Sequence, residues 1–158
     1  MTEGESVAVD GICSTVVALS GASFDVEYMR ETLSRTTARS FVRGNTVNVE
    51  RSLTFGERVH GHFVAGHVDA CGRVRAAARG VLAVSVPKPL MRFVAPKGSI
   101  TVNGVALTVT KKTHTVFSVA FIPYTLAHTN LGALKEGDSV NIEADLIARY
   151  MDVLLKKR

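Results

Sequence analysis

Residues 3–16 read EGESVAVDGICSTV, and residues 96–109 read PKGSITVNGVALTV. Both stretches alternate apolar and polar residues around a two-residue turn, which is Asp-Gly in the first and Asn-Gly in the second. These dipeptides accept the positive φ angles of a tight hairpin turn, so each stretch predicts two antiparallel strands. One strand–turn–strand unit therefore occurs twice in a chain of 158 residues.

The similarity between the two halves extends beyond these hairpins. A shift of 93 positions, without gaps, aligns residues 6–50 with residues 99–143, and 14 of the 45 pairs are identical. Average composition gives about 3 identities by chance over this length. The chain therefore contains an internal duplication.

After its hairpin, each half predicts another strand, a short helical turn and a later strand. These segments are residues 23–29, 31–38 and 46–51 in the first half and residues 116–122, 124–131 and 139–145 in the second. Short strands with regular turn signals predict an all-β fold, here two small antiparallel Greek-key barrels. Residues 145–158 carry apolar side chains at helical spacing and predict a C-terminal helix with one apolar face.

The second half contains a segment that the first half lacks. Residues 72–98 predict two strands and a short linker, and their counterparts would lie about 22 residues upstream of Met1. We expect the first barrel to be incomplete at its start, with the true start of the protein upstream. The alternative is that another strand fills the gap. The predicted domains are a truncated N-terminal barrel (1–70), a C-terminal barrel (71–144) and a terminal helix (145–158).

Composition limits the class of protein. Two cysteines are too few for a disulfide framework, and the N-terminus lacks the layout of a secretory signal. No apolar run approaches the ~20 residues that cross a bilayer, so we expect a cytoplasmic protein without a membrane partner. The net charge of +5 permits a nucleic-acid-binding barrel, but the basic residues are scattered and there is no Trp, which argues against it.

Seven segments, in order, resemble the riboflavin synthase family, whose members contain two lumazine-binding barrels. They are GESVAVDGICSTV (4–16), MRETLSRTT (29–37), VNVERSL (47–53), GHFVAGHVD (61–69), KGSITVNGVALTV (97–109), FIPYTLAHTNLG (121–132) and VNIEADLIARY (140–150).

The resemblance implies the dismutation of two 6,7-dimethyl-8-ribityllumazine molecules. A four-carbon unit passes from one to the other, giving riboflavin and 5-amino-6-ribitylamino-pyrimidinedione, with no organic cofactor and no metal. It also implies a homotrimer in which the N-terminal barrel of one subunit meets the C-terminal barrel of a neighbour, with the terminal helix (145–158) as a trimer contact. Lumazine synthase is implied as a further partner. The alternative is a non-catalytic lumazine- or flavin-binding protein of the same fold.

By the same resemblance, the catalytic residues are His67, Cys13, Ser6 and Asp145. His67 titrates near neutrality and can move the proton of the acidic C7-methyl group, while Cys13 either adds to C7 or holds a water there. The substrate-binding residues implied, besides Cys13 and His67, are Ser14, Thr15, Glu27, Tyr28, Met29, Arg30, Glu31, Thr32, Gly66, Val68, Lys97, Ala106, Leu107, Thr108, Ile122, Pro123, Tyr124, Thr125, Leu126 and Ala127.

Simpler interpretations stand beside these roles. Cys13 on an alternating strand is also a candidate for a small buried hydrophobic residue, and Asp145 for the N-cap of the last helix. Zinc binding is the alternative for the histidine-rich segment, but four ligands within twelve residues do not match structural zinc spacing. The four candidate ligands are His60, His62, His67 and Cys71.

The chain departs from the family pattern at three places. The N-terminal Met-Phe-Thr-Gly segment is missing, and this leaves open whether the chain is active in this form. The Cys-Leu-Thr motif is Cys13-Ser14-Thr15, which puts a polar residue where a leucine would face the core. The Ser-Leu-Thr motif of the second barrel is Ala106-Leu107-Thr108, which lacks one hydroxyl.

Overall fold

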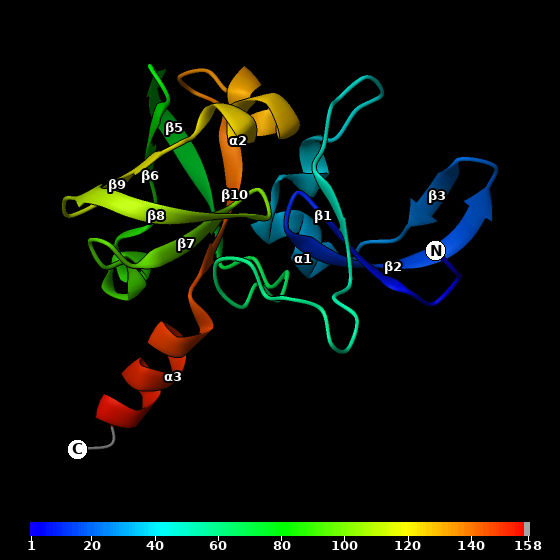
Figure 1. Ribbon diagram of the computed structural model, residues 1–158, viewed down its shortest axis with the longest axis horizontal. Coiled ribbons are helices and arrows are strands. Elements are labelled where there is room, and N and C mark those ends of the chain that lie inside the picture. The colour runs from blue at the N-terminus through cyan, green and yellow to red at the C-terminus, as the bar shows by residue number, and fades with distance from the viewer. Residues whose placement is uncertain (157–158) are drawn as a thin grey trace.

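The computed structural model describes residues 1–156, in which the two halves form separate β units (Figure 1). The first unit contains four strands, one short α-helix and one 3-10 helix. They are β1 (Ser6–Val9), β2 (Ile12–Ser20), β3 (Ser23–Val26), α1 (Arg30–Arg35), η1 (Thr37–Ser40) and β4 (Val49–Arg51).

The second unit is a closed six-stranded barrel with the strand order β10-β5-β6-β9-β8-β7. Its elements are β5 (Ala70–Ala78), β6 (Val81–Ser85), η2 (Lys88–Phe93), β7 (Ser99–Val102), β8 (Val105–Lys112), β9 (Val116–Ala120), α2 (Pro123–His128), η3 (Asn130–Ala133) and β10 (Ser139–Ala144). A last helix, α3 (Leu146–Leu155), follows the barrel.

The first unit repeats most of this barrel but stays open. Its strand order, β3-β2-β1-β4, matches β9-β8-β7-β10 under the 93-residue shift. Within the described residues, β5 and β6 have no counterpart in the first unit, so its sheet has two free edges. The predicted fold class is confirmed: an all-β chain with two related barrels, of which the first is incomplete, and a C-terminal helix.

Two strands of the open sheet are shorter than predicted. β3 ends at Val26 instead of residue 29, and β4 begins at Val49 instead of residue 46. In the closed barrel, β9 pairs with β6 and β8 on its two sides, whereas β3 pairs only with β2. β9 also ends early, at Ala120 instead of residue 122, so the missing neighbour accounts for only one of the three residues by which β3 is shorter than predicted.

The two units differ in how well they bury their apolar side chains. The barrel interior is closed around Phe117, Leu82 and Ile100, all with 0% exposure. The open sheet has a smaller core of Val7, Val9 and Val16, with partly buried side chains packed on it. The barrel therefore holds most of the hydrophobic stabilisation.

Ser14 lies in the core-facing row of β2, as its motif predicted, and is 4% exposed. Its hydroxyl donates to the carbonyl of Ile12 (2.9 Å) and accepts from the phenol of Tyr28 (2.9 Å). The equivalent position of the barrel is the buried Leu107. Two hydrogen bonds thus compensate for a hydroxyl in a leucine position.

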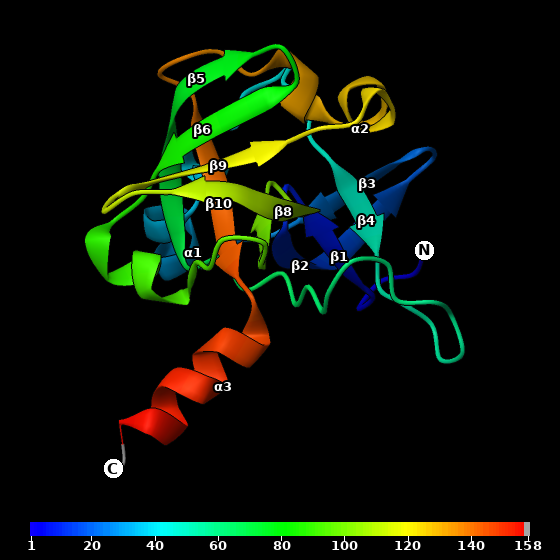
Figure 2. The ribbon, with the colours of Figure 1, turned by 60° about the vertical axis from the view of Figure 1, so that its left-hand side comes forward.

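Helix α3 projects from the barrel, with most of its surface free (Figure 2). Asp145 caps it, since its carboxylate accepts from the amide of Ile147 (2.9 Å), so the N-cap interpretation is confirmed. Its exposed apolar side chains are Ile147, Tyr150, Met151, Val153, Leu154 and Leu155. Lys157 and Arg158, the end of the predicted helix, lie outside the described residues. None of the helices within residues 1–156 is long and apolar enough to span a bilayer.

The hairpin turns of the two units meet back to back. A Cβ on Gly11 would lie 2.5 Å from the amide nitrogen of Gly104, and a Cβ on Gly104 would lie 2.9 Å from that of Gly11. Both glycines have positive φ, and only a glycine permits so close an approach of two backbones. The Asp-Gly and Asn-Gly turns therefore make the hairpins and also join the units.

A polar network around these glycines follows the internal symmetry. Asn48 donates its side-chain amide to the carbonyl of Asn103 (2.9 Å), and the equivalent Asn141 donates to the carbonyl of Asp10 (2.9 Å). The Asn48 side chain accepts from the amide of Asn130, as Asn141 accepts from that of Thr37. Each unit thus satisfies polar groups of the other.

Candidate functional site

Ser6, Cys13 and Thr15 lie on one face of the hairpin formed by β1 and β2. The strand register pairs Ser6 with Thr15 and Ala8 with Cys13, and successive side chains alternate between the two faces of a strand. Cys13 and Thr15 are exposed, whereas Ser14 between them points into the core. We call the surface formed by Ser6, Ala8, Cys13 and Thr15 the thiol face.

The segment that carries His67 packs against this face. Residues 52–69 contain no regular strand or helix and connect the two units. The carbonyl of Gly66 accepts from the amide of Cys13 (2.8 Å), and a Cβ on Gly66 would lie 2.8 Å from that of Cys13. A cavity of about 130 Å³ lies here, lined in part by Ser6, Cys13 and Gly66.

His67 follows Gly66 directly and is exposed. Its carbonyl accepts from the guanidinium of Arg149 (2.9 Å), and no hydrogen bond to its ring nitrogens occurs within residues 1–156. Three of the four predicted catalytic residues, Ser6, Cys13 and His67, lie at or beside the thiol face.

The predicted residues 27–32 belong to the junction between β3 and α1. Tyr28 is half-buried beside Ser14, and burial is the main cause that raises the pKa of its phenol above its ordinary value. Glu27 and Met29 lie in the connection, and residues 30–32 form the first turn of α1. This junction lies at the free edge of the sheet, since β3 pairs only with β2.

The second unit repeats this arrangement. Ser99 pairs with Thr108 across β7 and β8, and Lys97 has a positive φ of 65°, as does Gly4 at the equivalent position with 81°. Leu107 is buried, like Ser14. Val68 lies in the connecting segment and Ala106 on β8, and the remaining predicted residues lie at the N-cap of α2 and within it: Ile122, Pro123, Tyr124, Thr125, Leu126 and Ala127.

The connecting segment also reaches the second unit, which the sequence did not predict. A Cβ on Gly61 would lie 2.9 Å from the Cβ of Ala106, the residue equivalent to Cys13. The Nε2 atom of His62 lies 3.1 Å from the hydroxyl of Thr101 on β7. The segment thus contacts the second unit through Gly61 and His62 and the first unit through Gly66, and the Gly-His spacing in residues 61–67 was the available signal.

The candidate zinc ligands make other contacts. His62 contacts Thr101, and the thiol of Cys71 donates to the carbonyl of Arg35 (3.3 Å). Within residues 1–156, no group of three or more histidine, cysteine or acidic side chains lies close enough to hold a metal ion. Burial raises the pKa of the Cys71 thiol, which lowers its reactivity.

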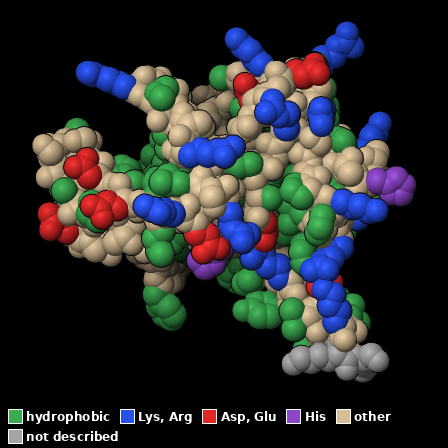
Figure 3. Space-filling model, turned by 180° about the vertical axis from the view of Figure 1, so that it is seen from behind, with side chains coloured by type: hydrophobic (Ala, Val, Ile, Leu, Met, Phe, Trp, Pro, Cys, Tyr) green, Lys and Arg blue, Asp and Glu red, His purple; other side chains and the backbone are tan. Residues whose placement is uncertain are grey.

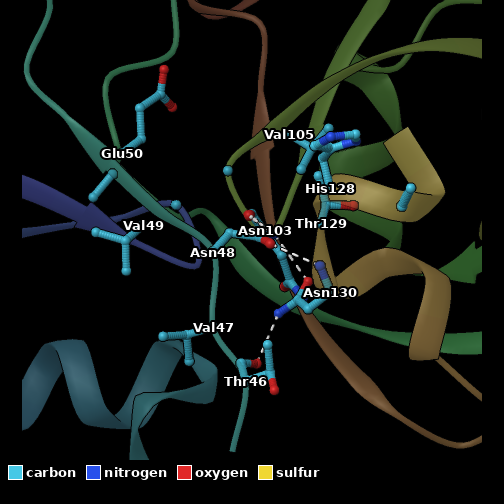
Figure 4. A pocket seen from close by; sticks show the side chains of 14 residues that line it. Thr46, Val47, Asn48, Val49, Glu50, Asn103, Val105, His128, Thr129 and Asn130 are labelled. Atoms are coloured by element: carbon cyan, nitrogen blue, oxygen red, sulfur yellow. Dashed lines mark hydrogen bonds between the residues drawn. The ribbon is translucent and has the colours of Figure 1, made fainter. Parts of the chain in front are cut away.

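A larger cavity, about 560 Å³, lies at the junction of the two units (Figure 4). Asn48, Asn103 and Asn130 come together at its base, and His128 of α2 lies at its side, stacked on Tyr124 with ring centroids 3.9 Å apart. Of the predicted site residues only Ala127 lines it. The asparagine amides are largely engaged with one another and with Asp10, so at the base of this cavity they join the two units.

Comparison with known proteins places these observations in a family. The Lumazine binding domain family matches residues 1–52 and 65–145. The riboflavin synthase of Photobacterium phosphoreum is 40% identical over 96% of this chain and 72% of its own length. That of Mycobacterium tuberculosis (strain ATCC 25618 / H37Rv) is 39% identical over 97% of this chain and 80% of its length. The chain belongs to the riboflavin synthase family.

The family match falls on the two β units and omits the middle of the segment between them. Its gap, residues 53–64, lies within the connecting segment that has no regular structure. The thiol face and the equivalent face of β7 and β8 therefore each belong to one lumazine-binding domain. The predicted membership in the riboflavin synthase family is confirmed.

Solved structures agree with this fold. The crystal structure of LumP complexed with riboflavin has a TM-score of 0.83 and 26% identity, covering 91% of this chain and 80% of that one. The structure of LumP complexed with 6,7-dimethyl-8-(1'-D-ribityl) lumazine has a TM-score of 0.79 and 25% identity, covering 91% and 79%. Both similarities extend over the two β units.

Proposed function

We propose that this chain is a riboflavin synthase. In the proposed reaction, two molecules of 6,7-dimethyl-8-ribityllumazine dismutate, and a four-carbon unit passes from one to the other. The products are riboflavin and 5-amino-6-ribitylamino-pyrimidinedione. The observation that carries the proposal is the 36–40% identity to riboflavin synthases across at least 96% of the chain, together with the thiol face beside His67.

The duplicated fold suits a reaction between two like molecules. Two related units can each hold one lumazine, and holding both in register supplies part of the rate, since orientation alone lowers a barrier by up to about 7–11 kcal/mol. In the first unit, the substrate would contact the thiol face and residues 27–32. In the second, it would contact Lys97, Thr108 and residues 122–127.

The proposed reaction begins with one proton transfer and one addition, and the group added at C7 leaves again as the four-carbon unit is transferred. His67, with a solvent-exposed ring, takes the proton of the C7-methyl group of one lumazine. Cys13 adds to C7 of its partner or holds the water that does so. Asp145 binds ribityl hydroxyls or a reacting proton, in addition to its observed role as the helix cap.

The competing candidate is a binding protein without turnover. LumP, whose structures hold riboflavin or the lumazine, shows that this fold also serves binding. Identity to LumP is 25–26%, against 36–40% to the riboflavin synthases, and this favours the enzyme. A nucleic-acid-binding barrel is disfavoured further, because Lys and Arg side chains are spread over the surface seen in Figure 3.

The proposed active form is a homotrimer in which the first unit of one subunit faces the second unit of a neighbour. The exposed apolar side chains of α3 support it, because water-exposed Ile147, Tyr150 and Leu154 gain from burial against equivalent helices. Sedimentation velocity should give three times the mass of 16.9 kDa, and a stable monomer would refute the trimer. Lumazine synthase remains a predicted further partner.

One assay tests the function directly. The purified chain is mixed with the lumazine, and growth of riboflavin fluorescence is followed. Product supports the enzyme, whereas tight binding without product supports the binding protein. His67→Ala should lower kcat at least tenfold with a smaller change in the Kd for the lumazine, because the ring moves a proton and holds little of the substrate. An unchanged rate would remove His67 from the mechanism.

A further inference from the structure

Strand β10 is buried on both of its faces. Val140, Ile142 and Ala144 point into the barrel core, and the alternating residues Asn141 and Glu143 point to the other side. Glu143 is 4% exposed. A carboxylate so far from water requires hydrogen-bond donors around it, and none of the ion pairs among residues 1–156 involves Glu143.

The donors are two consecutive main-chain amides of the connecting segment. One oxygen of Glu143 accepts from the amide of Ala65 (2.9 Å), and the other accepts from the amide of Gly66 (3.0 Å). Hydrogen bonds to a charged acceptor are about twice as strong as neutral ones. Both therefore hold the main chain at the two positions directly before His67.

The main chain after His67 is held by a second group of contacts. The Arg149 guanidinium donates to the carbonyl of His67 (2.9 Å) and to the carboxylate of Asp69 (2.8 Å). That carboxylate also accepts from the amide of Ala144 on β10 (2.8 Å). His67 is thus flanked on both sides by anchors from β10 and α3 of the second unit.

The held segment touches the thiol face of the first unit. Gly66 accepts from the amide of Cys13, and the approach is so close that a side chain at Gly66 would overlap Cys13. Glu143 lies in the second unit and therefore fixes where Gly66 of the connecting segment contacts Cys13 of the first unit. A displacement of the segment would move His67 relative to the thiol.

We propose that Glu143 is a positioning residue for the reaction, which holds the amides of Ala65 and Gly66 and thereby fixes His67 beside the thiol face. The inference rests on the proposed function. Misplacing a catalytic group by about 1 Å can cost about a hundredfold in rate. The predicted effect is therefore on kcat and not on substrate affinity.

The test is Glu143→Gln in the full chain. Glutamine has the same shape, but only one of its two terminal atoms accepts, so one buried amide loses its partner. We expect kcat to fall about 10- to 100-fold while KM stays within about threefold. Amide hydrogen exchange in residues 62–69 should accelerate, and iodoacetamide should alkylate Cys13 faster, with Cys71 as the internal reference.

The matched control is Glu136→Gln. Glu136 is an exposed glutamate in the turn before β10, and it lies outside the site. Equal kcat in the two variants, or a loss of kcat without faster exchange at residues 62–69, would overturn the proposal. Should Glu143→Gln fail to fold, Arg149→Met tests the anchor on the other side by the same readouts. If the unaltered chain forms no riboflavin, the proposed function is wrong. In that case the proposal for Glu143 is still testable, because unchanged amide hydrogen exchange at residues 62–69 and unchanged alkylation of Cys13 in Glu143→Gln would refute it.

Discussion

Asp10 accepts hydrogen bonds from both units through one carboxylate oxygen. The amide of Asn48 and the side-chain amide of Asn130 both donate to it at 2.8 Å. The residue is 5% exposed, and burial, the largest cause, raises its pKa above the ordinary value of 3.8 despite these donors. The equivalent residue is Asn103, whose side-chain oxygen accepts from Asn141 in the same way.

We predict that Asp10→Asn increases stability at neutral pH. Because its folded pKa is raised, folding favours the protonated form, and stability is lost as pH rises from about 3.8 through the folded pKa. Each unit of that rise costs about 1.4 kcal/mol at neutral pH, and asparagine avoids the cost. Urea denaturation should show the gain of the variant over the parent at pH 7 and little gain at pH 3.5. An equal difference at both pH values would contradict this account.

At the scale of the elements, the closed barrel and the open sheet form a natural comparison. Phe117 on β9 and Phe24 on β3 are equivalent residues of the repeat, but Phe117 is 0% exposed and Phe24 is only partly buried. In the closed barrel β6 pairs with β9 beside Phe117, and the first unit contains no equivalent of β6 within the described residues. The same side chain therefore has two surroundings in one molecule.

Phe117→Ala should cost about 3–5 kcal/mol of unfolding free energy, the usual loss for a fully buried phenylalanine. Phe24→Ala should cost clearly less, about 1–2 kcal/mol, because water already reaches part of its ring. Urea denaturation of both variants measures the difference. Equal losses would mean that the open sheet buries its phenylalanine in solution as fully as the barrel does.

Local signals predicted the elements well and their contacts poorly. The Asp-Gly and Asn-Gly turns, the helical segments around Thr32 and Thr125, and the incomplete first barrel follow from residue type, spacing and the repeat. The contacts of Glu143 with Ala65 and Gly66 bridge 78 and 77 residues and leave no local trace. The role of β10 as a strand buried on both faces could not be predicted for the same reason.

The arrangement of the whole molecule depends on the junction where the two hairpin turns meet. The 93-residue shift aligns Asp10 with Asn103 and Asn48 with Asn141. Nothing in the sequence showed that the Asn48 side chain donates to Asn103, and that of Asn141 to Asp10, across the two units. The contact between the two units could not be predicted, because its hydrogen-bond donors and acceptors are residue types that are common in any turn or strand. Its decisive feature is the close approach of Gly11 and Gly104.

Gly104→Ala should destabilise the molecule through this junction. Its positive φ of 82° costs an alanine about 1–3 kcal/mol. The new Cβ would also lie 2.9 Å from the amide nitrogen of Gly11, a backbone atom that cannot move aside as the end of a side chain can. Gly21→Ala is the matched control, since Gly21 has a φ of 58° in a hairpin turn with nothing within 4 Å of its Cβ. Thermal denaturation should show the loss for Gly104→Ala to exceed that for Gly21→Ala by about 2 kcal/mol, the usual order of overpacking at a tight contact. Equal losses would show that the turns contribute only their own conformation, and that the two units are held together elsewhere.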